Sequence, residues 1–299
     1  MFRGILIFAL FTIVSCDRNI KGRILNGTLA EAREIPYIAS LRTAASPFTH
    51  IAGGALISDR WVLTSASALI NLVPASISVV LGLIDSQQAV ALPGIRLLVS
   101  NIRRHEQFNI PHLGANDIAL VQLAAAAPCG GRYFGYISPI FIPSTREANP
   151  VDVVMSGWGA MSTNIGPGSR FLRTLRIRTI SNEDCQSFYA NDTNIQITFD
   201  VICTNNERGS GWCSTDIGGP LASANGLIGI ASHNVPCGQG APDVYTRVSS
   251  YRDWIRGITV NGRILNGNLA EAREIPYIAS LRSAVSPFTH FAGGALIHF

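Results

Sequence analysis

A small set of serine, aspartate and histidine side chains could carry chemistry in this chain. Acyl transfer through a hydroxyl requires a nucleophilic serine, a histidine that accepts its proton and a buried aspartate that orients the histidine. A serine without an adjacent base is a poor nucleophile at neutral pH. Side chains of these types stand at Ser65, Ser67, Asp117, Asp216, His50, His105, His112 and His233. The chemistry therefore depends on whether a serine and a histidine occupy positions from which they can act together.

Short strands are the elements that must position these side chains. Runs rich in Ile, Val and Leu recur between turn residues, as in GGALIS, WVLTS, ISVVLGL, DIALVQL, VDVVMSGWG and GLIGIAS. This pattern predicts an all-β fold. Residues 251–258 alone show a helical pattern, and we expect a helix there that closes the domain. A composition of 47% hydrophobic and 14% charged residues indicates large buried cores rather than disorder.

Charge and the first residues limit the partners and the compartment. The formal net charge of +4 comes from scattered Lys and Arg without a basic run, which argues against a nucleic-acid or membrane-surface partner. Arg3 precedes an apolar run from Ile5 to Val14, which is shorter than the roughly 20 residues needed to span a bilayer. Residues 1–16 are therefore predicted to be a signal peptide, and the protein is predicted to be secreted and extracellular.

The cysteines fit a disulfide framework rather than a metal site. Six cysteines in a secreted chain are expected to pair, because thiols outside the cell are not kept reduced. We predict loop-closing disulfides between Cys185 and Cys203 and between Cys213 and Cys237. Cys16 leaves with the signal peptide, so Cys129 has no partner and is either free or intermolecular. No metal-type spacing occurs, and we predict no metal and no cofactor.

A long repeat marks the end of the chain. The strings GRILNG, AEAREIPYIASLR, SPFTH and AGGALI occur from Gly22 and again from Gly262. A period this long indicates a domain duplication rather than a solenoid. Because the second copy stops at Phe299, residues 261–299 hold only the opening strands of a domain and cannot build a core alone. The segment is interpreted as a truncated product of a tandem array or a read-through remnant, with a functional C-terminal arm as the alternative.

Residues from Arg23 to about Ile258 resemble the chymotrypsin-like (trypsin-fold) serine proteases, especially the secreted arthropod chymotrypsins and brachyurin-type collagenases. The matching stretches are RILNG, GGALISDRWVLT, NDIAL, SGWG, GGPL and DVYTRVSSYRDWI. The resemblance implies two six-stranded antiparallel β-barrels with the active site between them, followed by a C-terminal helix. It also implies a short activation peptide over residues 17–23 and a protease-like domain over residues 24–260.

The residues that this family uses for catalysis are mostly replaced. Ser67 stands where the resemblance expects the histidine, and Ile217 stands where it expects the nucleophilic serine, so only Asp117 remains of the triad. Thr215 replaces the glycine whose backbone N–H forms part of the oxyanion hole. Ala52 and Ala68 occupy the two positions of a family disulfide that braces the histidine loop. We therefore expect an inactive homologue.

Other family features are retained. Arg23 followed by Ile24 resembles the bond that is cut on zymogen activation, after which the new ammonium pairs with the aspartate at position 216. The resemblance places Gly211, Trp212 and Asp243 at the specificity pocket, an arrangement similar to brachyurin-type members. Asp243 would favour a basic or apolar side chain there, whereas a bulky Trp212 would instead fill the pocket.

Three functions remain open at this level. The leading hypothesis is a secreted, non-catalytic serine protease homologue that binds a secreted protein or peptide, such as a protease or a protease inhibitor. The alternatives are a decaying tandem duplicate without a selected role and a serine-type endopeptidase with residual or unconventional activity.

Overall fold

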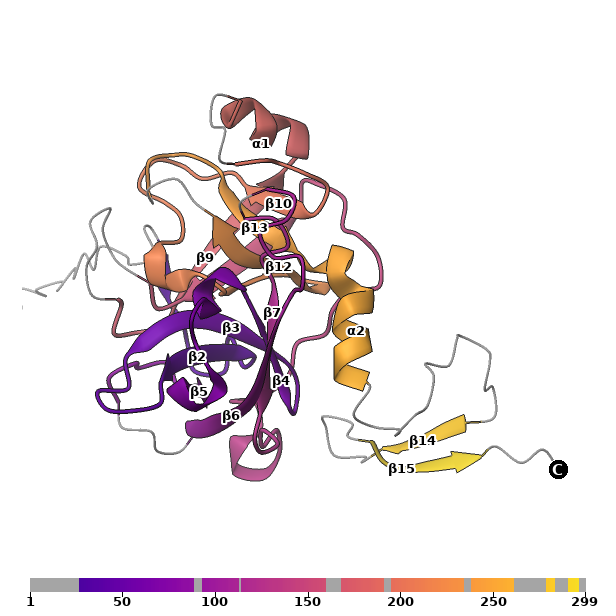
Figure 1. Ribbon diagram of the computed structural model, residues 1–299. Helices are drawn as coiled ribbons and strands as arrows, with labels where there is room; N and C mark the ends of the chain where they lie inside the picture. The colour runs from indigo at the N-terminus through magenta and orange to yellow at the C-terminus, as the bar shows by residue number, and fades with distance from the viewer. Residues whose placement is uncertain are drawn as a thin grey trace, which may run out of the picture.

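The computed structural model describes residues 27–88, 93–112, 114–159, 168–190, 195–233 and 238–260, together with the backbone of residues 278–282 and 290–295. Two β-barrels lie one above the other, and a helix near the end of the described domain runs along their side (Figure 1). The predicted all-β fold of two six-stranded antiparallel barrels is confirmed.

The first barrel closes in the order β2-β3-β4-β7-β6-β5, and every neighbouring pair is antiparallel. Its strands are β2 (Ile38–Thr43), β3 (His50–Ser58), β4 (Trp61–Thr64), β5 (Ile77–Leu81), β6 (Ile95–Arg104) and β7 (Ala119–Leu123). Aliphatic side chains such as Leu41, Leu56, Val62, Val79 and Val121 fill the interior and are fully buried. Burial of these side chains supplies the main driving force for closing this barrel.

The second barrel is built from six strands that close through the pairing of β8 with β9. They are β8 (Asp152–Gly157), β9 (Arg173–Ile180), β10 (Val201–Thr204), β11 (Pro220–Ser223), β12 (Gly226–His233) and β13 (Asp243–Arg247). The short β1 (Thr28–Leu29) adds to the outer edge of β9. The interior again consists of buried apolar side chains, including Met155, Leu175, Ile202 and Tyr245.

Two α-helices accompany the barrels. The predicted C-terminal helix is confirmed as α2 (Arg252–Val260), which follows a 3-10 turn at Val248–Tyr251 and buries Ile255 between the barrels. The expectation that this is the only helix is wrong, because α1 (Asn182–Phe188) precedes β10. The hydroxyl of Ser181 accepts the backbone N–H of Asp184 and caps the first turn, which also carries two acidic side chains.

The terminal repeat contributes a second hairpin. Strands β14 (Ile278–Arg282) and β15 (His290–Ala295) pair antiparallel with Ile278 opposite Ala295 and Arg282 opposite His290. In the first barrel, β2 pairs with β3 at the equivalent positions, and both hairpins carry a register shift at the same place. The repeated sequence therefore specifies the same local pairing twice.

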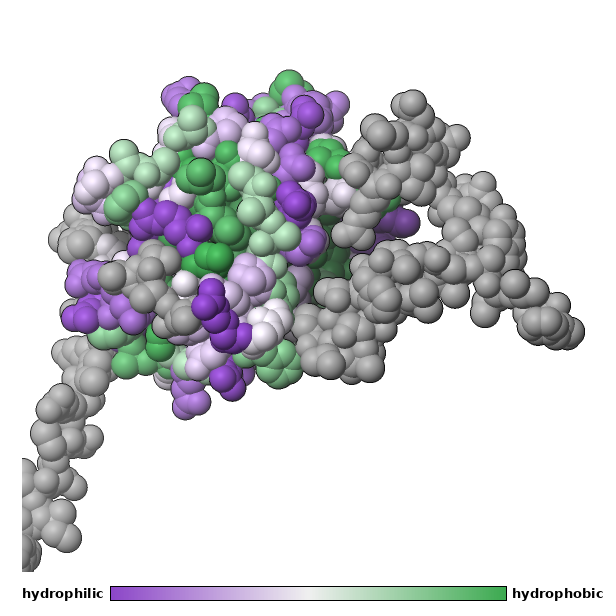
Figure 2. Space-filling model, turned by 90° about the horizontal axis from the view of Figure 1, so that it is seen from below, coloured by the Kyte–Doolittle hydropathy of each residue, from purple (hydrophilic) through white to green (hydrophobic). Residues whose placement is uncertain are grey.

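The surface is mixed in character. On the face seen from below, the described residues are hydrophilic and hydrophobic side chains interspersed with one another (Figure 2). Large apolar side chains that remain exposed include Leu98, Phe134 and Phe199. Scattered exposed apolar residues of this kind are normal for a folded protein.

Candidate functional site

Ser67 and Asp117 meet where the first barrel faces the second. Thr64 at the end of β4 pairs with Ala119 at the start of β7, so the residues just beyond these strand ends come together. The backbone N–H of Ser67 donates to Oδ1 of Asp117 at 2.7 Å, and the Ser67 hydroxyl donates to Oδ2 at 2.7 Å. A serine hydroxyl thus binds the carboxylate directly, in the place where the resemblance expects an imidazole.

Asp117 is also held from the second barrel. The hydroxyl of Ser232 on β12 donates to Oδ2 of Asp117 at 2.7 Å, and the hydroxyl of Thr246 on β13 donates to its backbone carbonyl at 2.7 Å. The Asp117 side chain is fully buried, and this burial raises the carboxyl pKa although the hydrogen bonds from Ser232 and Ser67 oppose the shift. Sequence reasoning missed Ser232 and Thr246, because only the packing of the two barrels brings them to Asp117.

Ile217 lies at the junction of the two barrel cores. It follows the 3-10 turn Ser214–Asp216, and its carbonyl accepts the N–H of Gly53 from the first barrel at 2.9 Å. Its side chain packs against the apolar cores of both barrels. The position therefore presents a partly buried hydrocarbon where a nucleophilic hydroxyl would stand.

The two alanines at the family's disulfide positions belong to the first-barrel core. Ala52 is fully buried, and Ala68 packs against the same cluster while remaining partly exposed. The segment from Ser65 to Leu69 is consequently held by apolar packing and by its hydrogen bonds. In one of these hydrogen bonds, the N–H of Ala68 donates to the Ser65 hydroxyl at 3.3 Å.

Asp216 is fully buried, and backbone N–H groups surround its carboxylate. Its Oδ1 accepts the N–H of Gly159 at 2.6 Å, and its Oδ2 accepts the N–H of Cys213 at 3.0 Å. A Cβ added at Gly157 or at Gly159 would lie within 2.1 Å or 1.9 Å of the carboxylate oxygens. Burial raises the Asp216 pKa to about 6, because the hydrogen bonds only partly offset the lost solvation. Arg23 and Ile24, the predicted activation bond, lie outside the described residues.

The predicted specificity-pocket residues come together, and the indole occupies the interior. Asp243 Oδ2 accepts the backbone N–H of Trp212 at 2.9 Å, and a Cβ at Gly211 would lie 2.9 Å from the same oxygen. The Trp212 side chain is 2% exposed and packs in the second-barrel core with Tyr245. Burial raises the Asp243 pKa to about 7. Of the two possibilities left by the sequence, the geometry matches the indole filling this space.

One of the two predicted disulfides lies wholly within the described residues. Cys185 and Cys203 form the predicted disulfide. Cys213 is also disulfide-bonded, whereas Cys237, its predicted partner, and Cys16 lie outside the described residues. Cys129 carries a free thiol, and burial raises its pKa to about 11, so little of it is thiolate at neutral pH.

His50 and His105 have structural contacts. Nε2 of His50 lies 3.1 Å from the carbonyl of Thr215, and its Nδ1 lies 2.8 Å from the Ser40 hydroxyl. Since a carbonyl only accepts, Nε2 carries the proton and Nδ1 accepts from Ser40. Burial lowers the His50 pKa to about 4, which keeps this ring neutral at physiological pH. The ring of His105 packs against the side chains of Tyr251 and Trp254.

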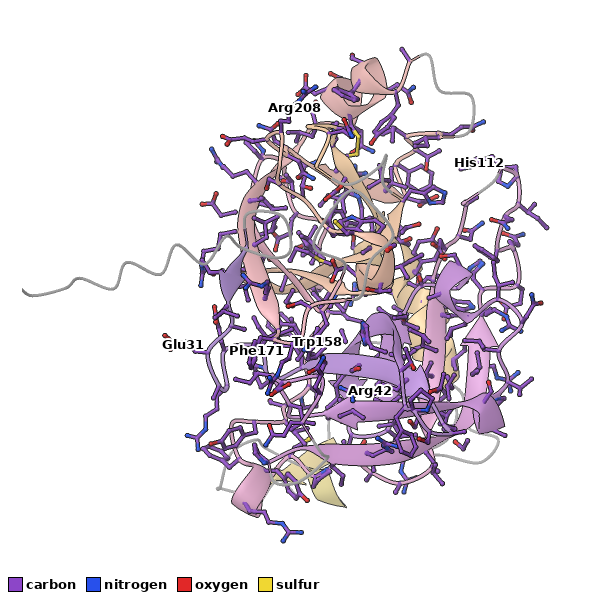
Figure 3. The ribbon with its side chains drawn as sticks, turned by 90° about the vertical axis from the view of Figure 1, so that its left-hand side faces the viewer. Glu31, Arg42, His112, Trp158, Phe171 and Arg208 are labelled. Carbon is purple, nitrogen blue, oxygen red and sulfur yellow. A yellow bond between two sulfur atoms is a disulfide. The ribbon has the colours of Figure 1, made fainter. Side chains whose placement is uncertain are left out.

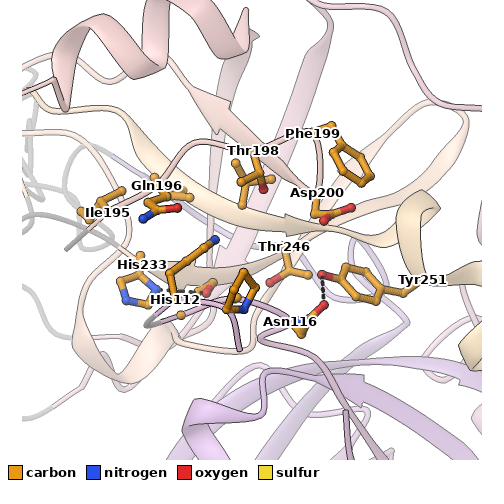
Figure 4. A pocket seen from close by; sticks show the side chains of 16 residues that line it. His112, Asn116, Ile195, Gln196, Thr198, Phe199, Asp200, His233, Thr246 and Tyr251 are labelled. Carbon is orange, nitrogen blue, oxygen red and sulfur yellow. Dashed lines mark hydrogen bonds between the residues drawn. The ribbon is translucent and has the colours of Figure 1, made fainter. Parts of the chain in front are cut away.

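A cavity opens beside Asp117 on the side of the second barrel. Its volume is about 360 Å³, and its lining includes Asn116, His233, Thr246, Phe199 and Tyr251 (Figure 4). The Tyr251 hydroxyl donates to Asn116 across one end of the cavity at 3.0 Å. His233 and His112 both point toward the cavity in this view. The lining combines apolar and polar side chains, as ligand-binding cavities commonly do.

None of the described groups of three or more His, Cys, Asp or Glu side chains is arranged to hold a metal ion. No helix within the described ranges is long and apolar enough to cross a membrane.

Comparisons with known proteins agree with this geometry. Residues 24–255 match the family described as Trypsin. The chain is 34% identical over 240 residues to serine protease SP24D of Anopheles gambiae, covering 78% of this chain and 80% of the relative. It is 32% identical over 234 residues to chymotrypsin-2 of Vespa crabro, covering 78% and 98%. It is 33% identical over 238 residues to trypsin II-P29 of Gallus gallus, covering 78% and 88%.

Proposed function

Because this chain belongs to the trypsin family of serine proteases, we propose that it is a non-catalytic member that acts outside the cell by binding a secreted protein or peptide. The observation that supports this proposal most directly is the pair of hydrogen bonds from Ser67 to Asp117. They occupy both carboxylate oxygens with donors that cannot serve as a general base for a nucleophile.

The hydrocarbon at position 217 supports the same proposal. Ile217 has no atom that can attack a carbonyl, and its packing against both barrel cores gives the side chain a structural role instead. Loss of the serine or the histidine lowers kcat by roughly a million-fold in a related triad, and losing both adds little because they act as a unit. The inherited cleft and the cavity beside Asp117 remain as binding surfaces.

Trp212 bears on how a partner would bind. The indole is 2% exposed and packs in the second-barrel core, so we expect it to restrict the entry of a partner side chain beside Asp243. We expect recognition to use the surface of the cleft and the cavity beside Asp117 rather than one deeply inserted side chain. We propose secreted proteases or protease inhibitors as partners. The disulfide between Cys185 and Cys203 is in keeping with an extracellular role.

An unconventional endopeptidase is the competing function. Among the described contacts of Ser67, the hydroxyl donates to Asp117 at 2.7 Å and lies 3.4 Å from the Ser65 hydroxyl, and neither contact is to an imidazole. His233 instead lies 3.2 Å from the Ser232 hydroxyl. This arrangement disfavours activation of Ser67 as a nucleophile.

The test compares the protein with a double variant that carries Ser67→His and Ile217→Ser, each prepared with Ile24 as its first residue. Turnover of a mixed peptide library and labelling by an organophosphonate serine probe are measured for both. We expect no turnover and no labelling of the parent protein, and both turnover and labelling of the double variant. Turnover by the parent that the probe abolishes would refute the proposal and favour the endopeptidase. If neither protein turns over peptides, the result would favour a decaying tandem duplicate without a selected role.

A further inference from the structure

A second hollow, separate from the cavity beside Asp117, is lined by residues that include Thr215. Its volume is about 760 Å³, and both barrels line it. Arg42 of β2, Arg96 of β6 and His50 of β3 come from the first barrel, and Trp158 and Thr215 come from the second. Arg42 and Trp158 appear close together on the face toward the viewer in Figure 3. Because Thr215 is two residues before Ile217, this hollow adjoins the cleft.

Arg42 lines this hollow and is a buried cation with one donor that is unused among the described residues. The side chain is 4% exposed, its Nε donates to the Ser40 hydroxyl at 2.9 Å, and its Nη1 donates to the Ser86 carbonyl at 3.0 Å. Within the described part of the chain, the buried Nη2 has no hydrogen-bond partner. An unmade hydrogen bond at a buried charged group is costly, so a ligand that accepts from Nη2 would gain correspondingly.

Arg96 brings a second positive charge to the same hollow. Its guanidinium lies 3.5 Å above the centre of the Phe48 ring, and its charge contributes to lowering the pKa of Arg42 after the larger effect of burial. Among the described residues that line it there is no aspartate or glutamate. The nearby carboxylate of Asp85 is already engaged in an ion pair with Arg170 at 2.9 Å. Two cations therefore converge on a space that lacks an anion among the described residues.

The second barrel adds one more unsatisfied polar atom. Oγ1 of Thr215 is buried and has no hydrogen-bond partner among the described side chains and backbone. The chain of contacts from Arg42 through Ser40 and His50 ends at the Thr215 carbonyl, which fixes the guanidinium relative to this residue. The hollow is thus preorganised by a hydrogen-bonded network rather than by loose surface side chains.

We infer that this hollow binds an oxyanion, and that its ligand is the carboxylate of an acidic side chain on the polypeptide held in the adjoining cleft. A guanidinium matches a carboxylate because both are planar and can form charge-assisted hydrogen bonds. His50 stays neutral, so the positive charge at this hollow comes from Arg42 and Arg96. The inference rests on the proposed binding function only in the nature of the ligand, because the anion site itself stands on Arg42 and Arg96.

The anion site is tested first with sulfate as the probe. Sulfate is titrated against chloride at constant ionic strength, and the side-chain Nε–H signals of arginine are followed by NMR. A saturable shift that chloride does not produce is expected. Arg96→Gln should weaken sulfate about tenfold, the equivalent of one charge-assisted hydrogen bond. Arg103→Gln, an exposed site on the same strand, should leave it unchanged. Equal binding by both variants, or no saturable shift, would overturn the site.

The peptide ligand is tested by selection from a random dodecapeptide display library. Peptides selected by the wild-type protein and by Arg103→Gln should share one position enriched in Asp or Glu, and Arg96→Gln should abolish that enrichment. Arg96→Gln carries the test because replacing Arg42 also removes two structural hydrogen bonds. Selected peptides without an acidic position would overturn the carboxylate ligand while leaving the binding function intact. Selection of no peptide would refute the binding function, and sulfate binding would still decide the anion site.

Discussion

Freeing the Ile24 amine should change how the stability of the protein depends on pH, through Asp216. In the uncut chain, burial raises the Asp216 pKa from 3.8 to about 6, which corresponds to about 3 kcal/mol of unfolding free energy. Because the native state holds this proton more tightly than the unfolded state, the contribution is full below the ordinary pKa. It is lost as the pH rises to about 6.

A neighbouring ammonium group would reverse the direction of the Asp216 pKa shift. Pairing with the Ile24 amine would favour the charged carboxylate and hold the Asp216 pKa below its ordinary range, so the loss between acid and neutral pH should disappear. The stability difference between cut and uncut chains should therefore shrink by about 3 kcal/mol when the pH is lowered from about 7 to about 4. Asp243, with its pKa raised to about 7, and His50, with its pKa lowered to about 4, also titrate here, but both are common to the two chains.

Urea unfolding followed by tryptophan fluorescence measures this difference across the pH range. The cut chain is made by placing the recognition sequence of a specific endopeptidase immediately before Ile24. Asp216→Asn should abolish the pH-dependent difference, and Asp243→Asn should keep it. Parallel stability profiles for the cut and uncut chains would refute the reasoning, because they would mean that no ammonium reaches Asp216.

Two further predictions concern the buried site. Gly159→Ala should destabilise the protein by several kcal/mol in thermal unfolding, because its Cβ would overlap the Asp216 carboxylate. Gly257→Ala in α2, with nothing within 4 Å of the added Cβ, should instead stabilise it by up to about 1 kcal/mol. Trp212→Ala should cost about 3–5 kcal/mol and open space beside the buried carboxylate of Asp243. Calorimetry should then detect benzamidine binding to this variant alone, and equal binding by the wild-type protein would contradict a filled pocket.

The strands could be predicted from the sequence because their information is local. Alternating and continuous apolar runs specify strands, and turn residues separate them. The closure of the strands into two barrels was implied only by the resemblance to the protease family. Helix α1 has a readable signal in the sequence, because Ser181 directly before it and Asp184 in its first turn form a capping pattern. The pairing of Cys185 with Cys203 was also predicted correctly.

Side-chain contacts over long sequence separations could not be predicted in the same way. Ser232 reaches Asp117 from the other barrel, and Arg42 of β2 shares its hollow with Trp158 and Thr215, which no spacing in the sequence reveals. The sequence also left open whether the Trp212 indole fills the space beside Asp243. That outcome depends on how the second-barrel core packs rather than on residue type.

The isoleucine at position 217 has an evolutionary consequence. Its side chain joins the apolar cores of the two barrels, so a return to serine would remove contacts from both halves of the molecule at once. Under the proposed function, a hydroxyl at position 217 without a neighbouring histidine restores no activity, so this step alone would lower stability without any compensating gain. If the chain is non-catalytic, as we propose, selection for folding therefore acts against restoring the serine.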